Sequence, residues 1–141
     1  MTQTQWLLLP AFALVALTFV TVLRIAAGRV AAVQARKVRP AVVAEDSSKW
    51  PQELHRITNN YQNLLEMPVL YYAGLALLVS TGLTDAVAIV LSWAFVISRF
   101  VHSFVHTGSN HLLRRFLAFA SGVITLIALW AWIGLRLYII G

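Results

Sequence analysis

Cysteine is absent from this chain of 141 residues, which excludes disulfides, thiolate metal sites and cysteine nucleophiles. Acidic residues are scarce: the chain has five Asp and Glu but eleven Lys and Arg, which gives a formal net charge of +6. Charged residues make up only 11% of the chain, whereas hydrophobic residues make up 60%. A soluble domain of this size cannot bury so much apolar surface, so the composition indicates a membrane protein.

Four apolar stretches are each long enough to cross a bilayer, which takes roughly 20 helical residues. We expect one domain over residues 1–141, an all-α bundle with transmembrane helices at about 6–27, 53–79, 85–107 and 112–138. The first helix should continue past the membrane to about Val38. A loop over about residues 36–52, punctuated by Pro40 and Pro51, should follow it. Asp85 is suited to the first turn of the third helix.

Positive charge is unevenly distributed between the connections. The segments 28–52 and 110–115 are rich in Lys and Arg, whereas the short turn at 80–84 has none. Loops rich in Lys and Arg stay in the cytoplasm, so both termini should face outward, into the periplasm if the protein lies in a bacterial inner membrane. The basic residues adjoin apolar spans, where they meet lipid headgroups, and no nucleic-acid-binding motif is present.

Polar residues enter the second span as a stripe. In the stretch HRITNNYQNLLEMPVLYY, residues 55–72, Arg56, Asn59 or Asn60, Asn63 and Glu66 recur three to four residues apart and so share one helix face. The third span carries a similar set, Arg99, His102 and His106. A charge in a bilayer centre costs about 2.5–3.5 kcal/mol on insertion scales, so such residues usually pair. We therefore predict an ion pair between Glu66 and Arg99, with either a structural or a functional role.

The polar residues of the cytoplasmic half exceed what one structural ion pair needs. Cationic and amide donors at this depth predict a site for an anionic, hydrogen-bonding ligand that is open sideways to lipid. The candidate residues are Arg56, Asn59, Asn63, Glu66, Arg99, His102, His106, Arg114 and Arg115.

Three segments, NNYQNLLEMP, SRFVHSFVH and HLLRRF, resemble the MAPEG family, the membrane-associated proteins in eicosanoid and glutathione metabolism. The resemblance covers roughly the second helix to the start of the fourth and suggests a bacterial-type member. It implies a homotrimer of four-helix subunits, with the co-substrate glutathione bound between neighbouring subunits. Asn63 and Glu66 match its second-helix pair, Arg99 and His102 match its third-helix motif, and His106 stands where a tyrosine is usual.

Arg115 matches the arginine that the family is thought to use for stabilising the glutathione thiolate, and we expect it to be the catalytic residue. The implied activity is conjugation or reduction of lipophilic electrophiles, as in a membrane-bound glutathione transferase or peroxidase with a detoxifying role. Arg56, Asn59 and Arg114 would contribute to glutathione binding, and either Arg24 or Arg29 would join them from the first helix.

Other functions remain open at the level of sequence. The chain could be a non-enzymatic protein of the same fold that binds a lipophilic ligand, or a small proton-coupled multidrug exporter in which Glu66 alternates between protonation and cation binding. Haem or quinone binding through His102 and His106 is a third alternative. We expect no metal site. Ala118 and Gly122 form a small-x-x-x-small pair, so Gly122→Leu should disrupt helix packing or assembly.

Overall fold

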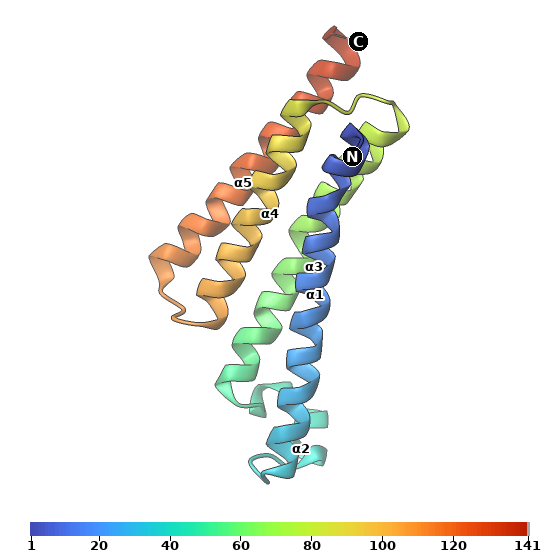
Figure 1. The fold of residues 1–141 in the computed structure, drawn as a ribbon. Helices are drawn as coiled ribbons and strands as arrows, with labels where there is room; N and C mark the ends of the chain where they lie inside the picture. Colours follow the sequence, from blue (N-terminus) through green and yellow to red (C-terminus); the bar gives the residue numbers. More distant parts are fainter. Residues whose placement is uncertain (141) are drawn as a thin grey trace.

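A computed structural model describes residues 1–140, which form four long α-helices and three short helical segments (Figure 1). The long helices are α1 (Gln3–Gln34), α3 (Gln52–Ser80), α4 (Ala86–Thr107) and α5 (Leu112–Leu135). The short segments are α2 (Pro40–Glu45), the 3₁₀ turn η1 (Ser47–Lys49) and the π-helical turn η2 (Arg136–Ile140). The described residues contain no strand, so the predicted all-α four-helix bundle is confirmed.

Each long helix is long and apolar enough to cross a membrane. The shortest, α4, has 22 residues, which at 1.5 Å per residue spans about 33 Å, close to the roughly 30 Å of a bilayer core. Large apolar side chains such as Phe12, Phe19, Phe104 and Ile127 are exposed on the outer faces of the bundle. Because a lipid environment suits such faces, the protein is an integral multi-pass membrane protein.

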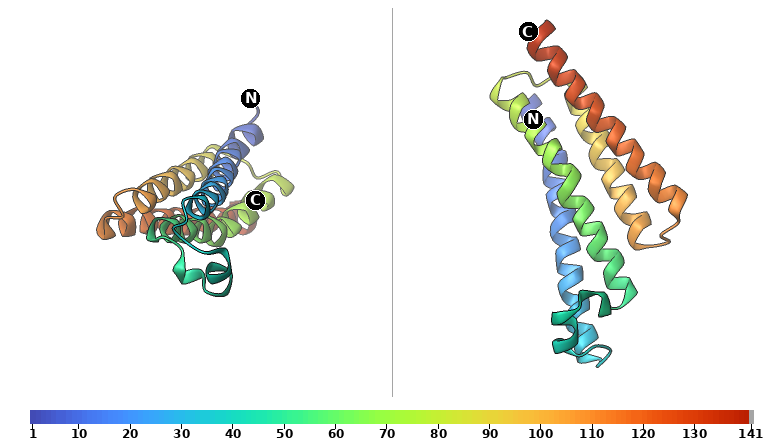
Figure 2. Two further views of the ribbon diagram at one scale, coloured as in Figure 1. Left: turned by 90° about the horizontal axis from the view of Figure 1, so that it is seen from below. Right: turned by 180° about the vertical axis from the view of Figure 1, so that it is seen from behind.

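Both termini and the α3–α4 turn lie at one end of the bundle, and the α1–α3 connection and the α4–α5 loop lie toward the other (Figure 1). At this second end, α1 and α3 extend well beyond the shorter α4–α5 hairpin (Figure 2). Asp85 is the N-cap of α4 rather than a first-turn residue, since its side chain accepts a hydrogen bond from the Ala88 amide at 2.9 Å.

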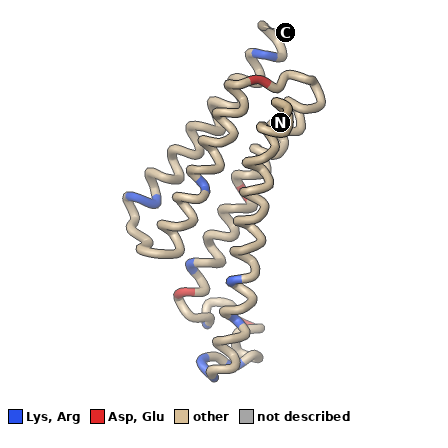
Figure 3. The backbone as a smooth tube through the Cα atoms, viewed as in Figure 1, with Lys and Arg blue, Asp and Glu red and all other residues tan. Residues whose placement is uncertain are grey.

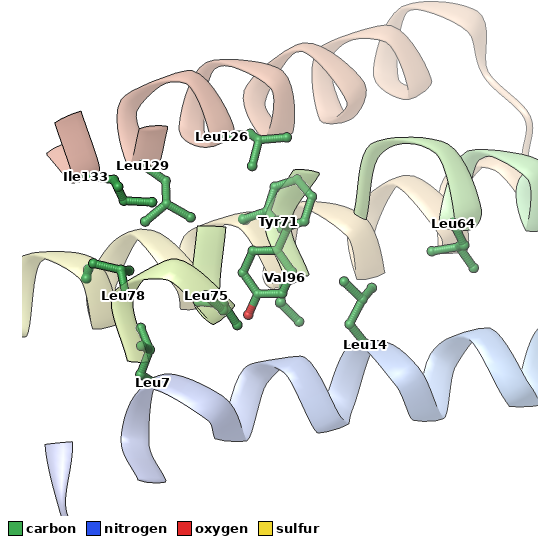
Figure 4. Close-up of a cluster of buried hydrophobic side chains, with 12 residues drawn as sticks. Leu7, Leu14, Leu64, Tyr71, Leu75, Leu78, Val96, Leu126, Leu129 and Ile133 are labelled. Atoms are coloured by element: carbon green, nitrogen blue, oxygen red, sulfur yellow. The ribbon is translucent and has the colours of Figure 1, made fainter. Parts of the chain in front are cut away.

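The core consists of apolar side chains from all four long helices (Figure 4). The α3 residues Leu64, Tyr71, Leu75 and Leu78 recur at helical spacing on one buried face. Tyr71 also joins a polar chain, because its hydroxyl lies 2.6 Å from Ser92 Oγ of α4, and Ser92 Oγ donates to the Leu7 carbonyl of α1 at 3.3 Å. This chain links three helices inside an otherwise apolar core.

The segment after α1 differs in detail from the sequence-based expectation. Helix α1 ends at Gln34 rather than near Val38, and Arg36 follows with a left-handed φ of 53°. Pro40 begins a short helix where we had expected only loop. The physical reason is that proline at the first helical position needs no N–H partner and already has a helical φ.

Candidate functional site

A cavity of about 360 Å³ lies between α3, α4 and α5 near the α4–α5 loop. Its lining residues are Asn59 and Asn63 of α3, His102 and His106 of α4, and Leu112, Arg115, Phe116 and Phe119 of α5. Five of these, two asparagines, two histidines and one arginine, are among the site residues predicted from sequence. The cavity therefore combines a cation, amides and imidazoles with an apolar wall.

Arg115 supplies the positive charge of the cavity. Its Nη1 donates to Asn110 Oδ1 at 2.9 Å, which anchors the guanidinium to the α4–α5 loop. Asn110 has a φ of 49°, a left-handed conformation that asparagine tolerates better than most residues. The main-chain carbonyl of Arg115 also lies 3.2 Å from His102 Nδ1, so one residue contacts both the loop and α4. The adjacent Arg114 is exposed and does not line the cavity.

Arg99 lies inside the α4–α5 interface and is only 1% exposed. Its Nη2 donates to the carbonyl oxygens of Ala118 and Phe119, both at 3.1 Å. The guanidinium carbon lies 5.3 Å from the centre of the Phe119 ring, close enough for a cation–π interaction. Gly122 leaves the space that this guanidinium occupies. Arg99 thus joins α4 to α5 and is not among the residues lining the cavity.

The predicted ion pair between Glu66 and Arg99 is wrong for the single subunit. In the part of the chain that the structure describes, the ion pairs are Lys49–Asp46 and Arg136–Asp85, and none joins Glu66 to Arg99. Glu66 is exposed on the outer side of α3. It lies six residues after Asn60, which donates to Ser103 Oγ of α4, and is therefore about 120° around α3 from the side that faces α4.

The remaining predicted arginines lie outside this cavity. Arg56 is partly buried, and its Nε has no hydrogen-bond partner among residues 1–140. Arg24 lines a separate cavity of about 440 Å³ between α1 and α3, whereas Arg29 lies over the Trp50 ring at 5.2 Å. Within one subunit, neither candidate from the first helix reaches the cavity at Arg115.

Several contributors to the site escaped the sequence analysis. Phe119 follows Arg115 by four residues and Leu112 precedes it by three, a spacing that could have placed them on the same face of α5. Asn110 could have been noticed only as a loop residue suited to a left-handed conformation. Asn60, which the sequence offered as the alternative to Asn59 in the polar stripe, does not line the cavity; it is fully buried and donates to Ser103 Oγ of α4 at 2.7 Å.

An apolar cavity of about 510 Å³ lies farther along the same two helices. It is lined by Met67 and Leu70 of α3 and by α5 residues that include Val123 and Trp130. Met67 and Val123 follow cavity residues of α3 and α5 by four positions, so they continue the same helix faces. The groove between α3 and α5 therefore changes from polar near the α4–α5 loop to apolar farther from that loop.

Comparison with known proteins gives one match. The model of the MAPEG family matches residues 7–135, which includes all four long helices except the first four residues of α1. No curated protein and no solved structure matches the chain.

Proposed function

The chain belongs to the MAPEG family, and on that premise we propose that it binds glutathione and conjugates or reduces lipophilic electrophiles through a stabilised glutathione thiolate. The observation that carries this proposal is the cavity that gathers Arg115 with two asparagines and two histidines between α3, α4 and α5. A tripeptide with two carboxylates, two amides and a thiol suits this combination of donors and acceptors.

Arg115 is the proposed catalytic residue. A thiol with a pKa near 8.5 becomes a good nucleophile at neutral pH when a nearby positive charge stabilises its anion. Lowering that pKa by one unit requires only about 1.4 kcal/mol of differential interaction, which one partly desolvated guanidinium can supply. The side-chain amides of Asn59 and Asn63 lie in the same cavity and can bind the peptide groups of glutathione.

The lipophilic electrophile would enter from the bilayer. The apolar cavity lined by Met67, Leu70 and Trp130 continues the faces of α3 and α5 that bound the polar cavity. An apolar substrate held there would have its reactive end toward Arg115 and its hydrocarbon part among apolar side chains.

Assembly as a homotrimer belongs to the same proposal. Glu66 is exposed on a transmembrane helix, and an unpaired carboxylate facing lipid is unfavourable. Coverage of this face by a second copy of the chain would remove that cost. It would also bring Glu66, and arginines of a neighbouring α1 such as Arg24, toward a site shared between subunits.

We further propose that the end of the bundle carrying the site is cytoplasmic and that both termini are periplasmic. Basic residues gather in the α1–α3 connection and at the start of α5, toward one end of the bundle (Figure 3). At the other end, the α3–α4 turn contains none. Cysteine labelling of intact cells at the exposed positions Ser109 and Thr81 tests this orientation, since only Thr81→Cys should react with an impermeant reagent.

Glutathione binding to the detergent-purified protein, measured by calorimetry and by ultraviolet absorbance of the thiolate, tests the function. We expect Arg115→Ala to raise the apparent thiol pKa by about one unit or more and to abolish turnover of a hydrophobic aryl halide or a lipid hydroperoxide. Arg39→Ala is the charge-matched control, because Arg39 is exposed and makes no capping hydrogen bond through its side chain.

Each alternative predicts a different result. If the Arg115→Ala protein kept the turnover and the thiolate absorbance of the parent, Arg115 would not be the catalytic arginine, and Arg114→Ala would be measured next. Binding of lipophilic ligands without turnover would favour the non-enzymatic protein of the same fold. Absence of glutathione binding in the parent would refute the glutathione proposal itself.

A further inference from the structure

The hydrogen-bonding pattern of His102 defines which of its nitrogens carries a proton. His102 Nδ1 lies 3.2 Å from the Arg115 carbonyl oxygen, and a carbonyl oxygen can only accept a hydrogen bond. Nδ1 therefore carries the hydrogen and donates. In the neutral imidazole, Nε2 then holds a lone pair and is a hydrogen-bond acceptor.

Nε2 of His102 is a buried acceptor without a partner. This nitrogen is inaccessible to solvent, and none of residues 1–140 donates a hydrogen bond to it. The side chain is 5% exposed and lines the cavity that also contains Arg115, Asn59 and Asn63. Because buried polar atoms in proteins are normally hydrogen-bonded, this unpaired acceptor, on a side chain that lines the cavity, leaves room for one hydrogen bond from a ligand.

We propose that His102 is the base that removes the proton from the glutathione thiol, an inference that rests on the function proposed above. The S–H bond breaks, its electron pair remains on sulfur, and the proton forms a new N–H bond at Nε2. The Arg115 guanidinium stabilises the thiolate, while the Arg115 carbonyl holds the imidazole in the tautomer that accepts the proton.

The arginines around His102 oppose a positive charge on its imidazole unless a negative charge forms beside it. Arg99 and His106 lie beside His102 on α4, and Arg115 faces it from α5. An added positive charge among these groups is tolerated when a negative charge forms next to it. Proton transfer creates the imidazolium and the thiolate together, so the net charge of the cavity does not change.

This mechanism differs measurably from one that relies on Arg115 alone. A guanidinium stabilises a thiolate but does not take up a proton, so each thiolate formed would release one proton to water. With His102 as base, the proton stays in the protein. The number of protons released per thiolate therefore distinguishes the two mechanisms.

The test is calorimetric titration of the parent protein with glutathione near pH 7 in two buffers of different ionisation enthalpy. Thiolate absorbance is recorded on the same samples. We expect clearly less than one proton released per thiolate formed. In His102→Asn, the amide nitrogen can still donate to the Arg115 carbonyl, but no base remains at the position of Nε2. We expect glutathione affinity within a few-fold of the parent, one proton released per remaining thiolate, and a kcat lower by about 10²- to 10⁴-fold.

His111→Asn is the matched control, because His111 is the exposed N-cap of α5 and does not line the cavity. His102→Gln is measured alongside in case the asparagine variant does not fold, and it should lose kcat equally. Parent-like turnover in a folded His102 variant, or one full proton released per thiolate by the parent, would refute the role of His102 while leaving glutathione chemistry intact. A parent protein that binds no glutathione would refute the proposed function and this inference together.

Discussion

Replacing Gly122 by alanine tests how tightly α4 and α5 are joined through Arg99. A Cβ at position 122 would collide with Arg99 Nη2 and would lie 2.6 Å from Ser98 Oγ, closer than side-chain atoms normally approach. Arg99 cannot move into solvent, because it is 1% exposed and its Nη2 is held by the carbonyl oxygens of Ala118 and Phe119.

The expected change in the free energy of unfolding is the sum of two costs and one gain. Overpacking a well-packed interior costs about 1–3 kcal/mol, and loss of a hydrogen bond to a charged group costs about 1.5–3 kcal/mol. The gain in helix propensity from glycine to alanine is about 1 kcal/mol. We therefore expect Gly122→Ala to lower the free energy of unfolding by about 1.5–5 kcal/mol, and Gly122→Leu by more.

Gly134 provides a matched control in the same helix. A Cβ there meets no heavy atom within 4 Å among the described residues, so Gly134→Ala should keep the propensity gain and leave stability equal or higher by up to about 1 kcal/mol. Equilibrium unfolding in mixed detergent micelles, followed by helical circular dichroism, measures both variants. If Gly122→Ala were as stable as Gly134→Ala, the Arg99 side chain would have to be freely displaceable, and the proposed α4–α5 linkage would be refuted.

Three further changes test other contacts. Tyr71→Phe removes the 2.6 Å contact with Ser92 Oγ and should lower the free energy of unfolding by about 1 kcal/mol, and an unchanged value would show that this core hydrogen bond is neutral. Asp85→Asn keeps a capping oxygen for α4 but loses the negative charge paired with Arg136 at 3.2 Å, so we expect the free energy of unfolding in detergent to fall by about 1 kcal/mol. Added salt should reduce this difference between parent and variant, and a difference that does not change with salt would contradict the role of the charge. Hydrogen bonds from Ser48 lower the pKa of Asp46 below the ordinary Asp value of about 3.9. The stabilisation of the α1–α3 connection by this carboxylate should therefore be complete at neutral pH and be lost only as the pH falls below about 3.9 and through the folded-state pKa. A carboxyl NMR titration that finds an Asp46 pKa at or above about 3.9 would contradict this.

The candidate site could be predicted in part from residue types and spacing. Asn59 and Asn63 fall on one face of α3, His102 and His106 fall on one face of α4, and all four line the cavity with Arg115. Their binding of glutathione remains a prediction. Arg114 lies outside the cavity although it is next to Arg115, because neighbouring helical residues point about 100° apart. Arg56 shares the face of Asn59 and Asn63 but lies about one turn nearer the start of α3, and it does not line the cavity.

Composition alone determined the class of the protein. A chain with 60% hydrophobic residues, 11% charged residues and four apolar stretches near the length of a bilayer core has no soluble alternative, and its backbone groups must be satisfied within helices. Asp85 could likewise be placed at the start of α4 from its position before an apolar run, although whether it capped the helix or lay in the first turn depended on geometry.

Only the tertiary structure decided the partners of the charged residues inside the bundle. Leu65, Val69 and Leu70 are exposed on α3 and Leu64, Tyr71 and Leu75 are buried, and both sets are apolar. In a helix that faces lipid on one side and protein on the other, apolar residues suit both environments, so sequence periodicity does not reveal which way the helix is turned. The rotation of α3 directs Glu66 outward, and the close approach of α5 at Gly122 gives Arg99 two carbonyl oxygens in place of a carboxylate.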